Sequence, residues 1–178
     1  VNVPWRLEFD AETGQLLERP KAPPGFLLAT APNEQWRVYH SWGPDTEAII
    51  EPKRFDRDPV TITTLGHSQI WRSDPSGDRL AQAFGQTIQI WDAVTGQSLG
   101  TLPHAVELSS FEWSPDGRQI ATTGKDKAIR LWDAKTFQQT AEFRQFPQEF
   151  SAFPYGGHFG SSSIVWTRDS RSLWIPLG

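Results

Sequence analysis

Two kinds of short stretch in this 178-residue chain carry side chains that could take part in catalysis or bind a metal. In the first, Gly157–Ser163, which reads GHFGSSS, a histidine stands close to three serines, as a general base stands close to a nucleophile. The stretch lacks the G-x-S-x-G pattern of a nucleophile elbow, and no strand-to-helix signal follows it. We therefore interpret it as a loop.

The second kind of stretch is acidic and occurs as DAETG, Asp10–Gly14, and as DAVTG, Asp92–Gly96. Each offers one turn carboxylate in the Asp position, whereas Ca²⁺ takes about six or more oxygen ligands. Asp at the start of a turn accepts backbone N–H bonds, and Gly at its end supplies a positive φ. We therefore predict tight turns here. A third copy begins at Asp133 but has Phe137 in place of the glycine, so we expect that turn to differ.

The composition limits the class of protein. Hydrophobic residues make up 37% of the chain, which is enough for one domain with a buried core. The net charge is −4 with no basic stripe, so we expect no nucleic-acid partner. No apolar run approaches the roughly 18 residues of a membrane span, so no membrane partner is expected. Cysteine is absent, which excludes disulfides and cysteine-based metal sites but fits any compartment. We expect no metal, no cofactor and a cytoplasmic location. Because the first residue is not Met, we expect a longer chain.

The elements that position the acidic turns recur along the sequence. Trp91 in IQIWD has a counterpart in Trp132 of IRLWD, and Phe9 in LEFDAETG lies twice that interval before Trp91. Nearly the same interval separates the turn glycines Gly77 and Gly117, in DPSGDRLA and SPDGRQIA. An internal period of about 40 residues predicts an array of one supersecondary unit.

The pattern inside each unit is that of strands. Ile88 and Ile90 alternate with Gln89 and Trp91, and the same alternation recurs before Trp132. Polar turns rich in Gly, Pro, Asp and Ser separate these short runs. We therefore predict a four-stranded antiparallel meander for each unit and almost no helix.

One unit, His104 to Thr136, combines a histidine lead, a Ser-Pro-Asp-Gly turn, a Gly-Lys-Asp-Lys turn and a Trp-Asp end. On these motifs the chain resembles the WD-repeat β-propeller family, well for residues 68–102 and more weakly for residues 25–65 and both ends. The resemblance implies an all-β β-propeller built of four-stranded antiparallel blades, about four blades' worth. The expected units are a half blade at 1–18, blades at 25–65, 66–103 and 104–143, an insertion loop at 144–157 and a half blade at 158–178.

Because the family usually has about seven blades, we expect an arc or segment of a larger propeller. The two half blades are complementary, so a closed four-bladed ring is the alternative.

The resemblance also implies a structural hydrogen-bond network. In the family a His, a Ser or Thr, an Asp and a Trp form a chain of hydrogen bonds within a blade, and the matching positions are His104, Thr122, Asp126 and Trp132. In that role the Asp orients the imidazole, and the buried Trp N–H finds a partner. The alternative is a catalytic His–Asp pair, for which the motif supplies no nucleophile or metal.

The preceding blade is expected to lack this network. His67 and Trp91 are present, but a step equal to the interval between the two Trp-Asp motifs places Ala81 and Gly85 at the positions of the Thr and the Asp. We therefore expect that blade to be less rigid.

The stretch RQFPQEFSAFPYGG interrupts the repeat and carries four aromatic side chains, Phe146, Phe150, Phe153 and Tyr155. Insertions in repeat arrays map to loops on one face, often the binding face. Two roles stay open. The aromatic side chains either fold back as a cap over the sheets, or they are a partner-binding site, because aromatic residues carry much interface energy.

The resemblance to WD-repeat proteins implies a non-catalytic protein–protein interaction scaffold or regulatory module whose partner is a protein. The alternatives are an enzyme of the hydrolase or dehydrogenase type with its active site at the central channel, and a sensory segment of a larger signalling protein. An enzyme would need polar groups that converge on the channel. The chain has four histidines, and His67, His104 and His158 share the lead position of the repeat.

Overall fold

The computed structural model of the chain describes residues 8–9, 13, 16–17, 26–40, 47–53, 58–66, 70–144 and 164–174. The regular elements in these residues are β-strands, and the complete sheets are four-stranded and antiparallel, which confirms the predicted all-β fold. In the described part no helix is long and apolar enough to cross a membrane.

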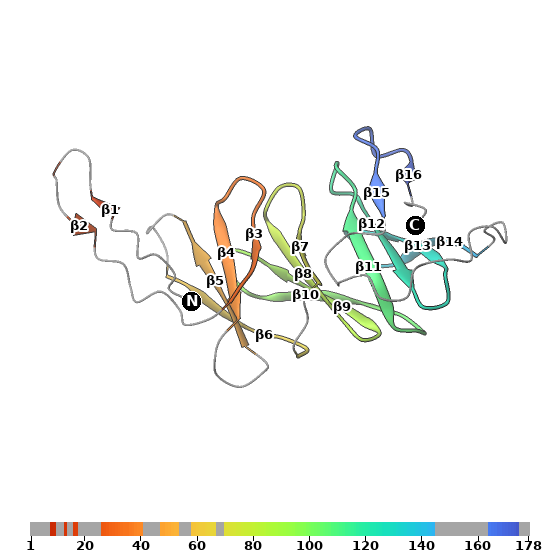
Figure 1. The fold of residues 1–178 in the computed structure, drawn as a ribbon, viewed down its shortest axis with the longest axis horizontal. Helices are drawn as coiled ribbons and strands as arrows, with labels where there is room; N and C mark the ends of the chain where they lie inside the picture. The colour runs from red at the N-terminus through yellow and green to blue at the C-terminus, as the bar shows by residue number, and fades with distance from the viewer. Residues whose placement is uncertain are drawn as a thin grey trace.

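Three complete sheets, called blades 1, 2 and 3, follow one another along the chain (Figure 1). Each pairs its strands in sequence order, so each is a meander. Blade 1 consists of β3 (Leu27–Thr30), β4 (Trp36–His40), β5 (Glu47–Pro52) and β6 (Val60–Thr63); blade 2 of β7 (Ile70–Ser73), β8 (Arg79–Phe84), β9 (Thr87–Asp92) and β10 (Ser98–Pro103); blade 3 of β11 (Leu108–Trp113), β12 (Gln119–Gly124), β13 (Ile129–Asp133) and β14 (Gln139–Phe143). Two strand pairs flank them: β1 (Glu8–Phe9) with β2 (Leu16–Leu17), and β15 (Val165–Trp166) with β16 (Leu173–Trp174).

The first strands of successive sheets lie next to one another. β3 contacts β7, β7 contacts β11, and β11 contacts β15. The turns that follow these four strands all point to the upper edge in Figure 1, and we call this side the turn end. The opposite side, the loop end, carries the loops that enter each blade, such as residues 64–66 and 104–107, and the turns after β8 and β12.

Two apolar clusters fill the spaces between the blades. Trp71 and Trp91 stack in the first cluster with ring centroids 5.8 Å apart. Burial of one large apolar side chain stabilises by about 1.5–3 kcal/mol, so these clusters are the main reason why the blades stack. Between blades 1 and 2 they include Trp36, Val38, Ile50, Ile62, Trp71, Leu80 and Trp91, and between blades 2 and 3 Ile88, Ile90, Leu102, Phe111, Trp113 and Ile120.

The turns after β11 and β15 share one local hydrogen-bond pattern. In blade 3, the Ser114 hydroxyl donates to Asp116 Oδ1 at 2.6 Å and accepts the Gln119 amide at 2.9 Å. After β15, the Thr167 hydroxyl donates to Asp169 Oδ1 at 2.6 Å and accepts the Ser172 amide at 3.0 Å. These short polar side chains close the turn on themselves, which explains the recurring turn punctuation in the sequence.

The turns after β9 and β13 are the predicted Asp turns, but the expectation that the second would differ is wrong. Phe137 adopts a φ of 59°, close to the 71° of Gly96, and both amides donate to the carbonyl of the leading Asp at 2.9 Å. The carboxylates of Asp92 and Asp133 accept the same pair of amides and one Thr hydroxyl. The leading Asp therefore fixes the turn, and Phe137 takes the left-handed conformation that is usual for Gly.

One repeat position links each blade to the next through its first turn. In blade 1, Trp36 Nε1 donates to the carbonyl of Gly77 at 2.6 Å. In blade 2, the same position is Arg79, whose Nη2 donates to the carbonyl of Gly117 at 2.9 Å and whose guanidinium lies 4.6 Å from the ring centre of Trp113. The link between blades is kept although an indole has been replaced by a guanidinium.

Candidate functional site

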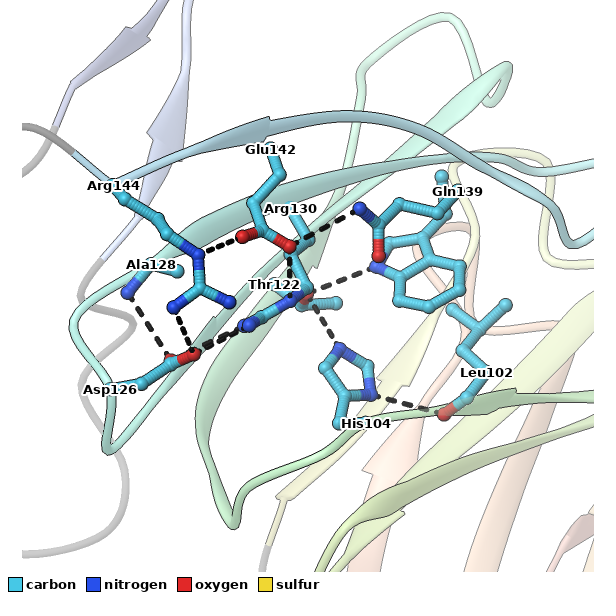
Figure 2. A network of polar contacts seen from close by, with 10 residues as sticks. Leu102, His104, Thr122, Asp126, Ala128, Arg130, Gln139, Glu142 and Arg144 are labelled. Carbon is cyan, nitrogen blue, oxygen red and sulfur yellow. Dashed lines mark hydrogen bonds and ion pairs between the residues drawn. The ribbon is translucent and has the colours of Figure 1, made fainter.

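The predicted network lies at the loop end of blade 3 (Figure 2). His104 stands in the loop between β10 and β11, Thr122 in the middle of β12, and Trp132 in β13. Asp126 stands in the turn between β12 and β13. Antiparallel pairing of β12 with β13 brings these residues to one end of the sheet, so the repeat signature gathers side chains that are far apart in sequence.

A directed chain of hydrogen bonds joins three of the four predicted residues. Trp132 Nε1 donates to Thr122 Oγ1 at 3.0 Å, and Thr122 Oγ1 lies 2.8 Å from His104 Nε2. His104 Nδ1 lies 3.1 Å from the carbonyl of Leu102. A carbonyl can only accept, so Nδ1 carries the proton. In the neutral imidazole, Nε2 then accepts from the Thr122 hydroxyl.

Burial keeps this imidazole neutral. His104 is 8% exposed, and its ring lies 4.9 Å from that of Trp132. Desolvation lowers the pKa of His104 to about 4, with the hydrogen bond to Leu102 acting in the opposite direction and the charge of Arg130 adding to the lowering. At neutral pH the ring therefore holds no charge and its two nitrogens are both occupied.

Asp126 does not orient His104, which corrects the role that the resemblance implied. Its carboxylate instead accepts Arg130 Nη2 at 2.5 Å and the amide of Ala128 at 3.3 Å. Because the Leu102 carbonyl already holds His104 Nδ1, the histidine needs no carboxylate, and Asp126 pairs with the buried cation.

Four charged side chains form a closed ring at this end of the blade. Arg130 Nε lies 3.2 Å from Glu142 Oε2, Arg144 pairs with Glu142 through its Nε, and Arg144 Nη1 lies 3.6 Å from Asp126 Oδ2. The Arg130 side chain is 4% exposed, so its charge needs both acidic partners. The hydrogen bond from Arg130 holds the pKa of Asp126 below its usual range, and that from Arg144 does the same for Glu142.

Three members of this ring, Arg130, Glu142 and Arg144, were missed in the sequence, although a signal for Arg130 was present. Arg130 stands two residues before the buried Trp132 on the same strand, so it points to the same face. An arginine on the buried face of a strand requires a carboxylate partner. Asp126 in the turn before β13 and Glu142 on the strand paired with it are both within reach of such an arginine.

In blade 2 the place of Thr122 is taken by Gln82, which corrects the expectation that Ala81 occupies it. Trp71 pairs with Gln82 in register as Phe111 pairs with Thr122. Counted between the equivalent register pairs, Ala83 with Ile88 and Thr123 with Ile129, the hairpin after β8 is one residue shorter than that after β12. The interval between equivalent residues of blades 2 and 3 is therefore one residue shorter before this hairpin than after it.

Gln82 is fully buried and holds the loop that enters blade 2. Its Nε2 donates to the carbonyl of Gly66 at 2.8 Å, and its Oε1 accepts the amide of Leu65 at 3.2 Å. The position that corresponds to His104 by the shorter step is Thr64. His67, like His158 and the rest of Gly157–Ser163, lies outside the described residues.

The arrangement in blade 3 resembles a base beside a hydroxyl nucleophile, but it is closed to a substrate. Thr122 is fully buried, and its hydroxyl accepts a hydrogen bond from Trp132 and donates one to His104. Among the described residues, no three His, Asp or Glu side chains gather as a metal site. The candidate partner site at Phe146, Phe150, Phe153 and Tyr155 lies outside the described residues and stays a prediction.

Comparisons with known proteins identify the repeat. The family model described as "WD domain, G-beta repeat" matches residues 96–133, which run from the end of blade 2 through the Trp-Asp of blade 3. Coronin-7 of Mus musculus is 32% identical over 122 residues, which are 66% of this chain and 12% of coronin-7. The nuclear distribution protein PAC1 of Arthroderma benhamiae is 45% identical over 104 residues, 57% of this chain and 21% of PAC1.

The serine-threonine kinase receptor-associated protein of Mus musculus is 29% identical over 62% of this chain and 30% of its own length. The chain thus spans less than a third of each of these relatives. Among solved structures, that of U3-55K superposes with a TM-score of 0.54 at 16% identity, over 68% of this chain and 40% of that chain, which shows a shared fold.

The WD40 match, the relatives and the four-stranded sheets agree with one another. In general terms they indicate a protein-interaction or regulatory module. The chain carries a WD40 repeat at residues 96–133, and its sheets are four-stranded blades of the β-propeller type.

Proposed function

We propose that the chain is a non-catalytic scaffold that binds a protein partner. The proposal rests on the observation that the polar side chains of blade 3 already bind partners within the structure. His104 binds Leu102 and Thr122, and Asp126 binds Arg130, so each of these groups has a partner within the structure. An active site needs such groups free to meet a substrate, as a general base must reach the proton that it abstracts.

The loop end offers a surface that a partner could cover. Leu65 and Phe84 are 39% and 43% exposed, and the Phe84 ring lies against Gly66, the chain neighbour of Leu65. Exposed neighbouring apolar side chains favour association with another protein. At the turn end, by contrast, the carboxylates of Asp92 and Asp133 are taken up by their own turns.

Affinity capture from a lysate of the source cells tests the proposal with a matched control. We expect the tagged chain to retain a protein partner, and the double variant Leu65→Ser/Phe84→Ser to lose it. Val94→Ser alters an apolar side chain of similar exposure, 47%, in the turn after β9, and should leave capture unchanged. Urea unfolding of each variant separates a lost contact from a lost fold.

The aromatic stretch is tested in the same assay by Phe150→Ser/Phe153→Ser. If these side chains anchor the partner, capture is lost while stability is kept. If they form a cap, stability falls because burial of each Phe contributes roughly 1.5–3 kcal/mol, while capture persists. A hydrolase or dehydrogenase turnover that disappears in His104→Gln would overturn the proposed scaffold function.

A further inference from the structure

A glycine and a bulky residue exchange places between the two blade boundaries. Where blade 2 meets blade 1, Gly96 in the turn after β9 faces Val60 on β6, and a β-carbon on Gly96 would overlap Val60 Cγ1. Where blade 3 meets blade 2, Phe137 in the turn after β13 faces Gly100 on β10, and a β-carbon on Gly100 would lie 2.5 Å from Phe137 Cδ2. Each boundary thus pairs one bulky side chain with one glycine.

The two pairs occupy equivalent positions in the repeat. Val60 and Gly100 each stand two residues before a buried apolar residue of the outer strand, Ile62 and Leu102. Gly96 and Phe137 each follow an Asp-Ala-x-Thr sequence and share the left-handed backbone of that turn. The two boundaries therefore differ in which blade contributes the bulky side chain and which contributes the glycine.

A similar exchange occurs inside the blades. In blade 2, Gly66 of the entry loop lies under the ring of Phe84, the last residue of β8, and a β-carbon on Gly66 would lie 2.9 Å from that ring. In blade 3, the corresponding loop residue is Val106 and the last residue of β12 is Gly124, with 2.7 Å between Val106 Cγ2 and a β-carbon placed there. The loop of each blade is thus fitted to its own strand.

We propose that the boundary pairs determine which blade docks on which. The blades share one fold, so the same docking geometry is available to wrong neighbours, including a blade from a second copy of the chain. If blade 3 docked on blade 1, Phe137 would collide with Val60. If blade 2 docked on the blade 2 of another copy, Gly96 would face Gly100 and leave a void. Both mismatches are unfavourable, because interiors tolerate neither overlap nor gaps.

A double-mutant cycle tests this neighbour specificity. Gly96→Phe introduces the blade 3 residue at the first boundary, and Val60→Gly removes the nearest obstacle, while Ile62 Cγ2 stays 3.2 Å from the added β-carbon. We expect Gly96→Phe to lower the urea midpoint, and Val60→Gly to raise the midpoint of Gly96→Phe although it lowers that of the unmodified chain. Gly85→Phe is the control for backbone strain, since Gly85 has a φ of 57° and its β-carbon would meet nothing within 4 Å.

The proposal is overturned if Val60→Gly lowers the midpoint equally in both backgrounds, or if Gly96→Phe is no less stable than Gly85→Phe. If Gly96→Phe does not fold, Gly96→Ala and Gly85→Ala repeat the comparison with a single added methyl group. In that series too, Val60→Gly must raise the midpoint of Gly96→Ala for the proposal to stand.

Discussion

Blades 2 and 3 hold their entry loops with different chemistry at the same strand position. In blade 3 the loop side chain of His104 reaches inward to Thr122 on β12. In blade 2 the strand side chain of Gln82 reaches outward to the backbone of Leu65 and Gly66. The entry loop is therefore held in both blades, although different residues hold it.

The two ways of holding the entry loop differ in how they respond to pH. The imidazole in blade 3 can take up a proton and lies near the buried Arg130, whereas the amide of Gln82 does not titrate. Blade 3 also contains the buried ion pair of Arg130 and Asp126, which is favourable only while both side chains are charged. Substitutions and pH should therefore distinguish the two blades.

We expect the largest effect from Asp126→Ala. The change leaves Arg130, with its side chain 4% exposed, to Glu142 alone. Loss of one partner of a buried ion pair costs about 3–5 kcal/mol, and the remaining Glu142 should reduce the loss to roughly 2–3 kcal/mol. Asp92→Ala removes more accessible turn bonds and should cost about 1 kcal/mol or less. Urea unfolding of both variants measures the difference.

The double variant Asp126→Ala/Arg130→Met is the control for this assignment. It removes the buried charge that has lost one of its two acidic partners, so it should be more stable than Asp126→Ala alone. Equal midpoints for Asp126→Ala and Asp92→Ala would contradict the buried ring of charges.

Thr122→Val and Gln82→Leu directly compare the two equivalent strand positions that hold the entry loops. Thr122→Val leaves Trp132 Nε1 and His104 Nε2 without their buried partner, and we expect a loss of about 2–3 kcal/mol. Gln82→Leu frees backbone groups of a partly exposed loop that water can reach, so about 1–2 kcal/mol should be lost. Denaturant titration of the two variants under identical conditions decides the order. If Gln82→Leu costs more, the two loops are not held as described.

The most gradual effect concerns pH. The pKa of His104 is about 4 in the folded chain and near 6.5 when unfolded, so the unfolded state gains a proton first as the pH falls. Its contribution to stability is complete above about pH 6.5, declines by at most about 1.4 kcal/mol per pH unit, and levels off below about pH 4. Carboxylates that face this region, Asp126 and Glu142, also titrate on acidification.

His104→Gln isolates the imidazole because the carboxylates are common to both proteins. The free energy of unfolding of the parent minus that of His104→Gln should fall between pH 6.5 and 4. A difference that stays flat over this interval would show that His104 is not buried as a neutral ring.

Much of the fold could be predicted from the sequence because its signals are local. Alternation around Trp91 and Trp132, and turns led by Asp or Ser, specify strands and hairpins without reference to distant residues. The position of Gln82 was missed because a single residue of difference in the hairpin after β8 changes the step of the repeat, and a constant step cannot register it.

Other features depend on contacts between distant segments. Phe137 keeps the turn of Gly96 because Gly100 of the preceding blade leaves room for its ring. Asp126 turns to Arg130 because the Leu102 carbonyl has already taken His104 Nδ1. Family resemblance alone could name the members of the network, but it could not say which of them bind one another.

The state of the His104 ring tests the central claim, that the polar group in blade 3 is structural. Long-range ¹H–¹⁵N correlation spectra of ¹⁵N-labelled protein, recorded from pH 7.5 to pH 4, report the tautomer and the pKa together. We expect a proton on Nδ1, a bare Nε2 and no titration until the pH approaches about 4. A proton on Nε2 would contradict the account because this nitrogen could not then accept from Thr122, and titration near pH 6.5 would contradict it because the ring would then be exposed to water.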